Sequence, residues 1–309
     1  MLFNVNSDTD KSFISRIIWL VENFIRNLNR TLVRGGKVIV LSNDFINIKN
    51  SDVLKRLSTP SRCLSDMFWH SLPWDDIKII LGGKIDVLDL GCGSGLYGKE
   101  IDVATKGALN SYHGIDIQEH EQWRECSKLN GKLSYSIAGV EDINKTYNAQ
   151  GLIISQSVLE HIPNDRKLIE DVCNIAMSTK SRIIQIHLIP SSACYYKYLW
   201  HGYRQYTPKN IEKILKNVKN SKCYLIPLGG KKCNKTHIKW ITIPEVIKRL
   251  LGIQNKDWTI EESYMKERNR SIQVDHDHPS HINKASFYAV IIDHNSTEDL
   301  EMSICRHFE

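Results

Sequence analysis

A short apolar strand that runs directly into alternating glycines is the feature that most limits how this chain can fold. Residues 85–90 read Ile-Asp-Val-Leu-Asp-Leu, and Gly91, Gly93 and Gly95 follow at every second position before a helix-forming stretch. Glycine has no Cβ, so such a loop can turn sharply and let a ligand approach the backbone without meeting a side chain. The pattern predicts a strand, a ligand-binding turn and a helix in succession.

Further apolar strands are predicted at 112–117, 133–138, 151–155, 183–189, 223–228 and 287–292, with helical or loop segments between most of them. This alternation predicts an α/β fold: a doubly wound, mostly parallel seven-stranded sheet with helices on both faces. In such sheets a ligand lies beyond the carboxyl ends of the strands, where the strand order reverses. We therefore look for the chemistry at that edge.

Two carboxylates stand at strand ends near the glycines. Asp116 ends the second predicted strand, where it can accept hydrogen bonds from both hydroxyls of a ribose, so an adenosine-containing cofactor is expected. Residues 93–98 also match the G-x-G-x-x-G fingerprint of nicotinamide dinucleotide sites. That register would begin two residues after the first glycine and would leave Asp89 without a function. A nicotinamide-dependent dehydrogenase is therefore the weaker interpretation.

Four segments in chain order resemble the class I S-adenosylmethionine-dependent methyltransferases. They are D-x-G-x-G-x-G from Asp89 followed by Asp116, then Ala-Gly-Val-Glu-Asp-Ile at 138–143, Ser-Gln-Ser-Val-Leu-Glu-His-Ile at 155–162, and Arg-Gln-Tyr-Thr-Pro at 204–208. The close agreement covers about 84–190, is looser beyond it, and leaves 1–80 and 254–284 outside. The resemblance implies a Rossmann-like fold, S-adenosylmethionine as cofactor and methyl transfer as the activity.

The resemblance also implies residue roles. The methionine portion would contact Asp89 and the glycines, and the ribose would contact Asp116. The adenine would lie beside Ile117, the backbone N–H of Val140 and the carboxylate of Glu141 or Asp142. Many members carry an acid immediately before the equivalent of Val140, where this chain has Gly139. Ser155, Gln156 and Ser157 would lie beside the sulfonium end. The cofactor-binding residues expected are Asp89, Gly91, Gly93, Gly95, Asp116, Ile117, Val140, Glu141, Ser155 and Ser157.

Methyl transfer from S-adenosylmethionine to an acceptor is an in-line displacement. It needs the acceptor to be oriented toward the methyl group, but it needs no metal and no protein nucleophile. If the acceptor is a hydroxyl, a general base helps, and His161 and His201 are the catalytic candidates because histidine titrates near neutral pH. His161 could equally hold its turn by hydrogen bonds. The residues around His201, from Trp200 to Tyr206, could line an acceptor pocket or pack a lid. No metal is expected.

Charge and composition leave several functions open. Between Lys209 and Arg249 there are eleven Lys and Arg against two acids, which can attract an anionic surface, RNA or a phosphorylated acceptor. The first hypothesis is a methyltransferase for a small-molecule or sugar- or lipid-linked acceptor. The alternatives are an RNA methyltransferase that uses 209–249, for which no separate RNA-binding module is visible, and a non-catalytic S-adenosylmethionine-binding partner subunit.

The N-terminal eighty residues are predicted to be mainly helical. Apolar residues from Ile14 to Leu32 recur at helical spacing among arginines, and Gly35-Gly36 would end that helix. Such a helix can lie on a membrane surface, but the preferred interpretation is that its apolar stripe docks on its own domain. A second helical passage covers 64–81, with a break or helix start at Pro73. The domains expected are a helical extension or lid at 1–80, the methyltransferase domain at 81–295 with a polar insertion near 254–284, and a C-terminal tail at 296–309.

Eight cysteines without a C-x-x-C pair are expected to be free thiols, mostly packed as small hydrophobes. A zinc site at Cys223, Cys233 and His237 is disfavoured by irregular spacing. The run from Asp275 to His281 resembles a metal cluster but is expected to be a solvated loop in an inserted loop or hairpin. The longest apolar stretches are too short to span a bilayer and no signal-peptide order is seen. The cytoplasm, with a possible peripheral position at the membrane, is therefore the compartment expected.

Overall fold

An eight-stranded sheet forms the centre of the computed structural model, which describes residues 5–28, 30–32, 36–194, 200–250 and 262–296 together with 300 and 304. The strands are β1 (Val38–Val40), β2 (Ile85–Leu90), β3 (Leu109–Asp116), β4 (Leu133–Ile137), β5 (Leu152–Gln156), β6 (Ile183–Pro190), β7 (Ser221–Leu228) and β8 (Phe287–His294). Their order is β1-β7-β8-β6-β5-β2-β3-β4. The strand β8 runs antiparallel to β6 and β7, and the other pairs are parallel.

The sheet confirms the predicted α/β fold class and adds one strand. The seven predicted strands are β2 to β8, and the eighth is β1, which comes from the segment assigned to the N-terminal extension and pairs with β7. Only three residues long, β1 gives too little alternation to be recognised as a strand from the sequence. From β2 the chain proceeds to β3 and β4 on one side and to β5 and β6 on the other, so the strand order reverses at β2.

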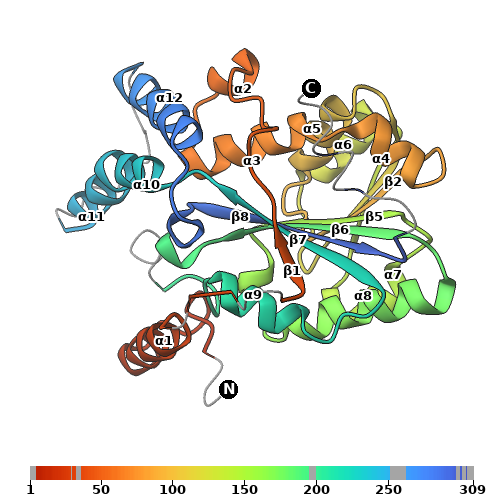
Figure 1. Cartoon of the computed structure of the whole chain (residues 1–309), viewed down its shortest axis with the longest axis horizontal. Helices are drawn as coiled ribbons and strands as arrows, with labels where there is room; N and C mark the ends of the chain where they lie inside the picture. Colours follow the sequence, from red (N-terminus) through yellow and green to blue (C-terminus); the bar gives the residue numbers. More distant parts are fainter. Residues whose placement is uncertain are drawn as a thin grey trace.

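Helices cover both faces of the sheet (Figure 1). The helices are α1 (Phe13–Arg26), α2 (Ser51–Leu54), α3 (Pro60–Ser71), α4 (Trp74–Ile80), α5 (Leu96–Ala104), α6 (Gln122–Leu129), α7 (Ile143–Thr146), α8 (Asp165–Thr179), α9 (Pro208–Leu215), α10 (Lys231–His237), α11 (Ile243–Leu250) and α12 (Glu262–Asp277). Short turns of helix are η1 (Val140–Asp142), η2 (Leu159–His161), η3 (Ser192–Cys194), η4 (Ile238–Thr242) and η5 (Ile282–Lys284). None of the described helices is long and apolar enough to cross a bilayer.

Alternation along the strands divides the core into two layers. In β2, Ile85 and Val87 point to a cluster formed with α3 to α6, whereas Leu88 and Leu90 point to a cluster formed with α8 and α9. This is the result expected when successive side chains point to opposite faces of a sheet covered on both sides. The second predicted helical passage is α3 and α4, which meet at the break that Pro73 introduces.

The helix α1 corrects two expectations. It ends at Arg26, where Asn27 caps it, rather than at Gly35-Gly36. Its apolar stripe does not dock on its own domain: the buried positions are Ser15, Trp19 and Asn23, while the apolar residues point outward. We call these the apolar stripe, and its members are 44% to 77% exposed: Phe13, Ile14, Ile17, Val21, Phe24, Ile25 and Leu28.

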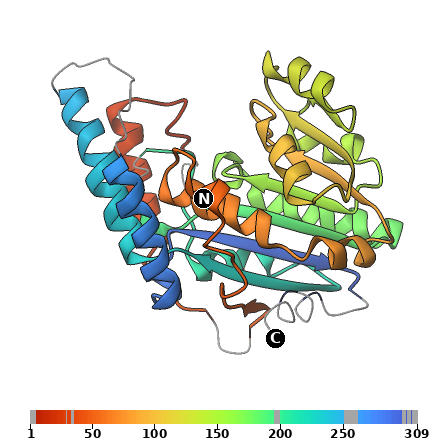
Figure 2. The same ribbon diagram turned by 90° about the horizontal axis from the view of Figure 1, so that it is seen from above.

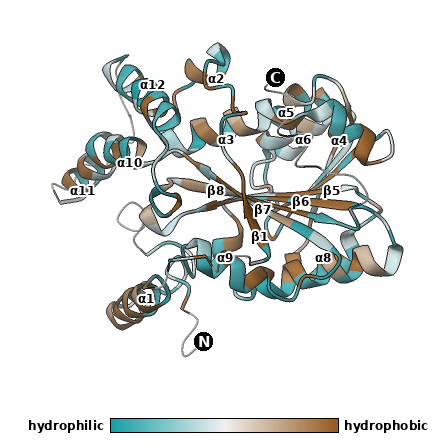
Figure 3. Cartoon of the chain, viewed as in Figure 1, coloured by the Kyte–Doolittle hydropathy of each residue, from teal (hydrophilic) through white to brown (hydrophobic). Residues whose placement is uncertain are grey.

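The inward face of α1 explains this orientation. The Trp19 indole N–H donates to the Gly202 carbonyl oxygen at 2.9 Å, and the Asn23 amide donates to the Tyr203 carbonyl oxygen at 3.2 Å. The Gln205 N–H in turn donates to Asn23 Oδ1 at 3.3 Å. Buried backbone groups need such partners, so the polar face of α1 is the one turned inward. Figure 3 shows much of α1 in the brown of hydrophobic residues at the edge of the molecule.

The polar segment near 254–284 is also not the loop or hairpin expected. Residues 251–261 lie outside the described part, but 262–277 form α12. Its Arg268 is fully buried and donates to the carbonyl oxygens of Leu54 at 2.5 Å and Arg56 at 2.6 Å. Asp275 is buried too and accepts from the backbone N–H groups of Lys232 and Cys233. These charged residues therefore bind backbone groups of other elements instead of meeting solvent.

The seven described cysteines are buried and free, as expected. His237, which sequence spacing placed near Cys223 and Cys233, hydrogen-bonds through Nδ1 to Thr242 Oγ1 at 3.2 Å. The C-terminal tail at 296–309 lies mostly outside the described residues. The division of the chain at residue 80 stays a prediction, although β1 joins the same sheet as the strands after it.

Candidate active site

The glycine loop lies between β2 and α5, at the point where the strand order reverses. The N–H groups of Gly91 and Cys92 both donate to the Ile115 carbonyl oxygen, which joins the start of the loop to β3. Gly95 has φ +78°, and a Cβ there would lie 2.6 Å from the Tyr135 ring. A Cβ on Gly93 would instead meet nothing within 4 Å. The loop is therefore packed at its end and open at its middle, where a ligand can approach the backbone.

Both predicted strand-end carboxylates face this loop. Asp116 accepts from the Gly93 N–H at 2.9 Å through Oδ2 and from the Gln118 N–H at 3.2 Å through Oδ1. Asp89 is only 4% exposed and accepts from the Tyr112 hydroxyl. Burial raises the pKa of Asp89 to about 7, against the opposing effect of that hydrogen bond. A carboxylate that is buried and has a raised pKa is suited to bind a cationic group of a ligand.

A cleft of about 200 Å³ lies over the loop. The described residues that line it are Arg62, Asp89, Gly91, Cys92, Gly93, Ser94, Leu96, Tyr97 and Gln156. The structure thus brings Asp89, Gly91 and Gly93 together as predicted, with Asp116 bonded to Gly93 behind them. Gln156 accepts from the Trp69 indole N–H at 3.1 Å, so α3 reaches the end of β5.

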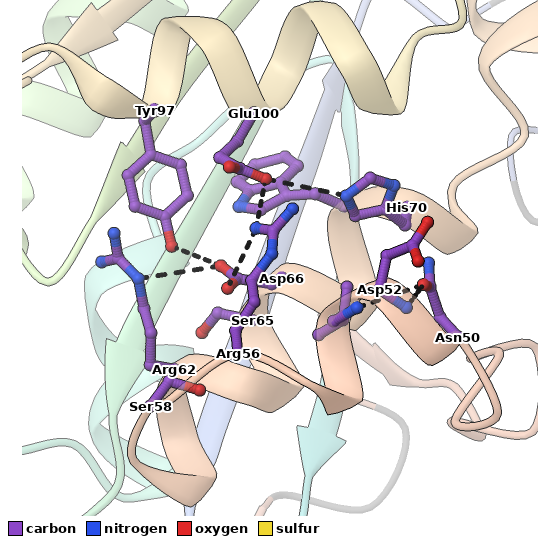
Figure 4. Close-up of polar contacts among 12 residues, drawn as sticks. Asn50, Asp52, Arg56, Ser58, Arg62, Ser65, Asp66, His70, Tyr97 and Glu100 are labelled. Atoms are coloured by element: carbon purple, nitrogen blue, oxygen red, sulfur yellow. Dashed lines mark hydrogen bonds and ion pairs between the residues drawn. The ribbon is translucent and has the colours of Figure 1, made fainter.

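Sequence reasoning missed the contribution of α3 (Figure 4). The Arg62 guanidinium lies over the Tyr97 ring at 4.0 Å from its centroid, and Arg62 Nε is 3.7 Å from Asp66 Oδ1. The Tyr97 hydroxyl donates to the same oxygen at 3.0 Å. The residue Arg62 precedes the glycine loop by a long stretch of chain, so no local pattern links them. The only sequence signal is Thr59-Pro60, which starts α3 and places Arg62 in its first turn.

A second layer of charge supports this contact. Arg56 NH1 lies 2.5 Å from Glu100 Oε2 and 3.8 Å from Asp66 Oδ2, and His70 Nε2 lies 3.8 Å from the same Glu100 oxygen. These pairs join α3 to α5, as the dashed lines in Figure 4 show. The network fixes Asp66, and through it the position of Arg62 at the cleft.

Other predicted cofactor residues lie away from that cleft. Val140 and Glu141 line a separate cleft of about 340 Å³ beside the start of α8. Gly139, the position where family members carry an acid, is covered by the Glu141 carboxylate: a Cβ there would lie 2.3 Å from Glu141 Oε1. Ile117 is 71% exposed. The structure therefore places these three residues on the loops after β3 and β4, but not on the cleft over the glycines.

The two predicted serines differ from each other. Ser155 is 1% exposed, and its hydroxyl lies 2.8 Å from His187 Nδ1 inside the sheet, so its side chain does not reach the cleft. Gln156, one residue later, lines the cleft over the glycine loop. Ser157 has φ +54°, and its N–H donates to the Leu188 carbonyl oxygen at 2.8 Å. This turn directs the chain from β5 into η2, which carries His161.

The structure joins both predicted catalytic histidines through a residue that the sequence did not suggest. Asp8 Oδ2 lies 2.8 Å from His161 Nδ1, and Asp8 Oδ1 lies 3.3 Å from His201 Nδ1. The Gly202 N–H also donates to Asp8 at 2.8 Å. The two rings stand nearly perpendicular with centroids 4.5 Å apart. Since the potential ligand atoms all lie within 4.8 Å of one another, the cluster could hold a divalent ion as well as a proton.

Electrostatics adjusts the proton affinity of this cluster. Burial disfavours charge on His161, but its hydrogen bond to the Asp8 carboxylate and the charge of the nearby Glu160 outweigh this effect, so the His161 pKa is raised. Burial also opposes ionisation of Asp8, yet its bonds to the histidines hold its pKa well below the usual range. Glu160 is fully enclosed, and burial raises its pKa to about 7. The cluster therefore holds Asp8 ionised and favours a proton on His161.

The dense group after β6 divides into two parts. Arg204 and Tyr206 are buried and bind Asp165, with Arg204 NH1 at 2.8 Å and the Tyr206 hydroxyl at 2.8 Å from Oδ2. They pack a turn and do not line a pocket. Trp200 remains 37% exposed beneath the Arg16 guanidinium, and His201 belongs to the Asp8 cluster.

The glycine loop and Asp116 lie in a segment that is similar to a known protein family. A family model described as a methyltransferase domain matches residues 88–177. No curated protein matches the sequence. The fold is similar to that of the plantazolicin methyltransferase BpumL in complex with SAH, with 13% identity and a TM-score of 0.46 over 90% of this chain and 100% of that one.

Two further solved structures are similar. One is a putative sarcosine dimethylglycine methyltransferase from Galdieria sulphuraria, with 14% identity and a TM-score of 0.45 over 76% of this chain and 85% of that one. The other is the cyclase SpnF, with 10% identity and a TM-score of 0.44 over 94% and 96%. Likeness at these levels assigns no acceptor to this chain.

The matched segment begins on β2 and includes the glycine loop, Asp89 and Asp116. It therefore covers the place where the strand order reverses, at which the open backbone of Gly93 lies near the carboxylates of Asp89 and Asp116. Residues 88–177 therefore belong to a class I S-adenosylmethionine-dependent methyltransferase domain, whose cofactor is S-adenosylmethionine.

Proposed function

We propose that this enzyme methylates a small-molecule or sugar- or lipid-linked acceptor, and that His161 removes the acceptor's proton. The observation that supports this most directly is the hydrogen bond between Asp8 and His161, because it joins the N-terminal segment to η2, the turn that follows β5. A carboxylate that holds Nδ1–H of an imidazole fixes the tautomer and leaves Nε2 able to accept a proton. The cytoplasm, with a peripheral position at the membrane, is the compartment that we propose with it.

The donor set fits S-adenosylmethionine. Asp89 would bind the ammonium group and Arg62 the carboxylate of the methionine portion. Asp116 would accept from the ribose hydroxyls with the lone pairs that Gly93 and Gln118 leave, and the open position at Gly93 would take the chain of the cofactor. We keep Ile117, Val140 and Glu141 as the adenine side of the site.

When bound, S-adenosylmethionine supplies an electrophilic methyl group already activated by a sulfonium charge. The protein holds the acceptor in line with that group, at about 3 Å from it, and excludes competing orientations. His161 accepts the proton of an acceptor hydroxyl, and Asp8 stabilises the imidazolium that forms. His201, on the other oxygen of Asp8, is placed to hold the acceptor or to replace His161 as base.

Transfer of radioactive methyl groups from S-adenosylmethionine tests this proposal. The substrates to compare are nucleotide sugars, glycans, lipid-linked sugars and a total RNA preparation. Label in the sugar or lipid fraction supports the proposal. Label in RNA would replace it with the RNA methyltransferase alternative. Tight cofactor binding with no label in any fraction would favour the non-catalytic subunit.

We expect the affinity for S-adenosylmethionine to fall in acid because of Asp89. The carboxyl has a pKa of about 7 in the free protein, and the cofactor's ammonium group requires its ionised form. As the pH falls below 7, the dissociation constant should therefore rise by about tenfold per unit, and above 7 it should level off. Calorimetric titration from slightly alkaline to slightly acid pH measures this.

The control is Tyr112→Phe, which removes the hydroxyl that donates to Asp89. Loss of that donor raises the Asp89 pKa further, so the midpoint of the affinity curve should move to higher pH. The range that decides is about one pH unit above and below the Asp89 pKa. A dissociation constant that did not change across this range would contradict the assignment of Asp89.

A variant of His161 should lose turnover without losing the cofactor. We expect His161→Ala to lower kcat by about 10²-fold or more with an unchanged dissociation constant for S-adenosylmethionine, since general bases contribute about 10²–10⁴-fold. Asp8→Asn should lower the His161 pKa and so shift the rising limb of the rate–pH profile to lower pH. The rates are measured with the acceptor fraction that becomes radioactively labelled in the transfer experiment. Equal loss of cofactor affinity in His161→Ala would indicate a structural role instead.

A further inference from the structure

The apolar stripe of α1 cannot turn toward the rest of the protein. Rotating it inward would break the hydrogen bonds of Trp19 and Asn23 to residues 202–205, which sit beside the Asp8 cluster. The stripe is therefore held outward by the same contacts that position the proposed site. Contiguous exposed apolar patches of this kind mark interaction surfaces in stable proteins.

A second exposed apolar group lies on α11. Ile243, Val246 and Ile247 are spaced by three and four residues, so they share one helical face, and each is 48% to 50% exposed. Figures 1 and 2 both place α11 and α1 at the same end of the molecule, away from α5 and α6. Two amphipathic helices thus present apolar side chains at one end.

Between the end of α1 and α10 is a cationic cleft of about 660 Å³, which we call the basic cleft. Its charged residues are Arg30, Lys231, Lys235 and Lys284, and no acidic side chain is among the described residues that line it. Phe24 and Leu28 of the apolar stripe form part of the same lining. Apolar side chains and cations therefore meet on one continuous surface.

Among the described cations of the 209–249 stretch, Lys231 and Lys235 line the basic cleft. The stretch is divided among α9, β7, α10 and α11, and Lys209 is paired with Glu212 at 2.7 Å. The lysines of α10 are the ones that gather at clefts, because Lys232 and Lys235 also line a second one with Lys266 and Arg270. Of the basic residues in 209–249, the lysines of α10 are therefore the ones that line the clefts.

We infer that the apolar stripe, the apolar face of α11 and the basic cleft together dock on an anionic phospholipid surface. Such a surface accepts apolar side chains below its headgroups and attracts lysine and arginine to its phosphates. The charge distinguishes this occupant from a second copy of the chain, since a symmetric contact would place basic cleft against basic cleft. The apolar stripe distinguishes it from RNA, whose phosphates attract the cations but give the exposed apolar side chains no surface to bury against. The inference rests on the peripheral membrane position in the proposed function and names the surface that would make it, and it stands on residues outside the cofactor cleft.

Flotation of the full-length protein with vesicles tests the inference. We expect binding to phosphatidylcholine vesicles that contain phosphatidylglycerol, weaker binding to phosphatidylcholine alone, and loss of the difference in high salt. Replacing Phe24 and Ile25 by Asp should lower binding by roughly tenfold or more, because two apolar anchors become charged. Lys231→Glu with Lys235→Glu should remove the preference for phosphatidylglycerol.

Matched controls keep folding and docking apart. Val103→Asp and Leu129→Asp change apolar residues that are 60% and 74% exposed on α5 and α6, and both should bind vesicles as the wild type does. The Phe24 and Ile25 variant should retain calorimetric binding of S-adenosylmethionine, which shows that it is folded.

The inference is overturned if the wild type floats with neither vesicle, or if the Val103 and Leu129 controls lose binding equally. It is also overturned if the apolar stripe instead supports a dimer that dissociates in the Phe24 and Ile25 variant, or if RNA rather than lipid retains the protein. None of these measurements uses an acceptor, so docking can fail while methyl transfer succeeds, and the reverse.

Discussion

Asp116→Ala is expected to weaken binding of S-adenosylmethionine by at least about 100-fold. A carboxylate that accepts two ribose hydroxyls makes charge-assisted hydrogen bonds worth roughly 1.5–3 kcal/mol each, and a hundredfold change corresponds to about 2.7 kcal/mol. The substitution also removes the acceptor for the Gly93 N–H, so the loop loses a bond on the side where the cofactor approaches. Calorimetric titration with S-adenosylmethionine and S-adenosylhomocysteine measures both effects together.

Two variants separate them. Asp116→Asn keeps an acceptor oxygen and the side-chain shape, so it should lie between the wild type and alanine. Glu125→Ala removes an exposed carboxylate from the neighbouring α6 and should leave the affinity unchanged. If the Asp116→Ala variant bound the cofactor as tightly as the wild type, Asp116 would not be the residue that binds the ribose.

Arg204→Met is expected to destabilise the protein by about 3–5 kcal/mol, because it leaves the buried Asp165 without its cation. Both side chains are 5% exposed, and Arg204 also donates to the carbonyl oxygens of Ile162 at 3.0 Å and Pro163 at 2.7 Å. Tyr206 shares the same Asp165 oxygen. Urea denaturation measures the change in the free energy of unfolding, and the turn that carries His161 should open first.

The exposed pair of Lys145 and Asp142 is the control for this prediction. Its lysine side chain is 82% exposed, and Lys145→Ala should change stability by less than about 1 kcal/mol. The double variant Arg204→Met with Asp165→Leu should be less destabilised than the sum of its single variants, since no buried charge remains unpaired. An Arg204→Met protein as stable as Lys145→Ala would mean that water reaches Asp165 and that the turn is not locked.

The glycine loop could be located from the sequence because its parts are local. Asp89, Gly91 and Gly93 lie within five residues, so one strand and one turn bring them together whatever surrounds them. Asp116 follows on the next strand, and parallel neighbours end at the same edge of a sheet. Of the residues expected beside the sulfonium end, strand alternation puts the Ser155 side chain inside the sheet and Gln156 at the cleft.

The acceptor half depends on contacts that no local pattern contains. Asp8 meets His161 and His201 across 153 and about 190 residues of chain, and it does so only because Trp19 and Asn23 fix α1 against the 202–205 segment. Arg62 reaches the cleft in the same way, through the pairs that join α3 to α5. These positions are set by polar groups that satisfy distant backbone atoms.

The sequence by itself determined the α/β sheet, the glycine loop and the class of cofactor, because strand alternation and glycine geometry act over a few residues. Only the tertiary structure decided which face of α1 is buried. Periodicity identifies an apolar stripe but not its partner, and here hydrogen bonds from Trp19 and Asn23 to buried backbone groups turn the stripe outward. An unpaired buried carbonyl is costly, so satisfying it outweighed the burial of the stripe against the domain.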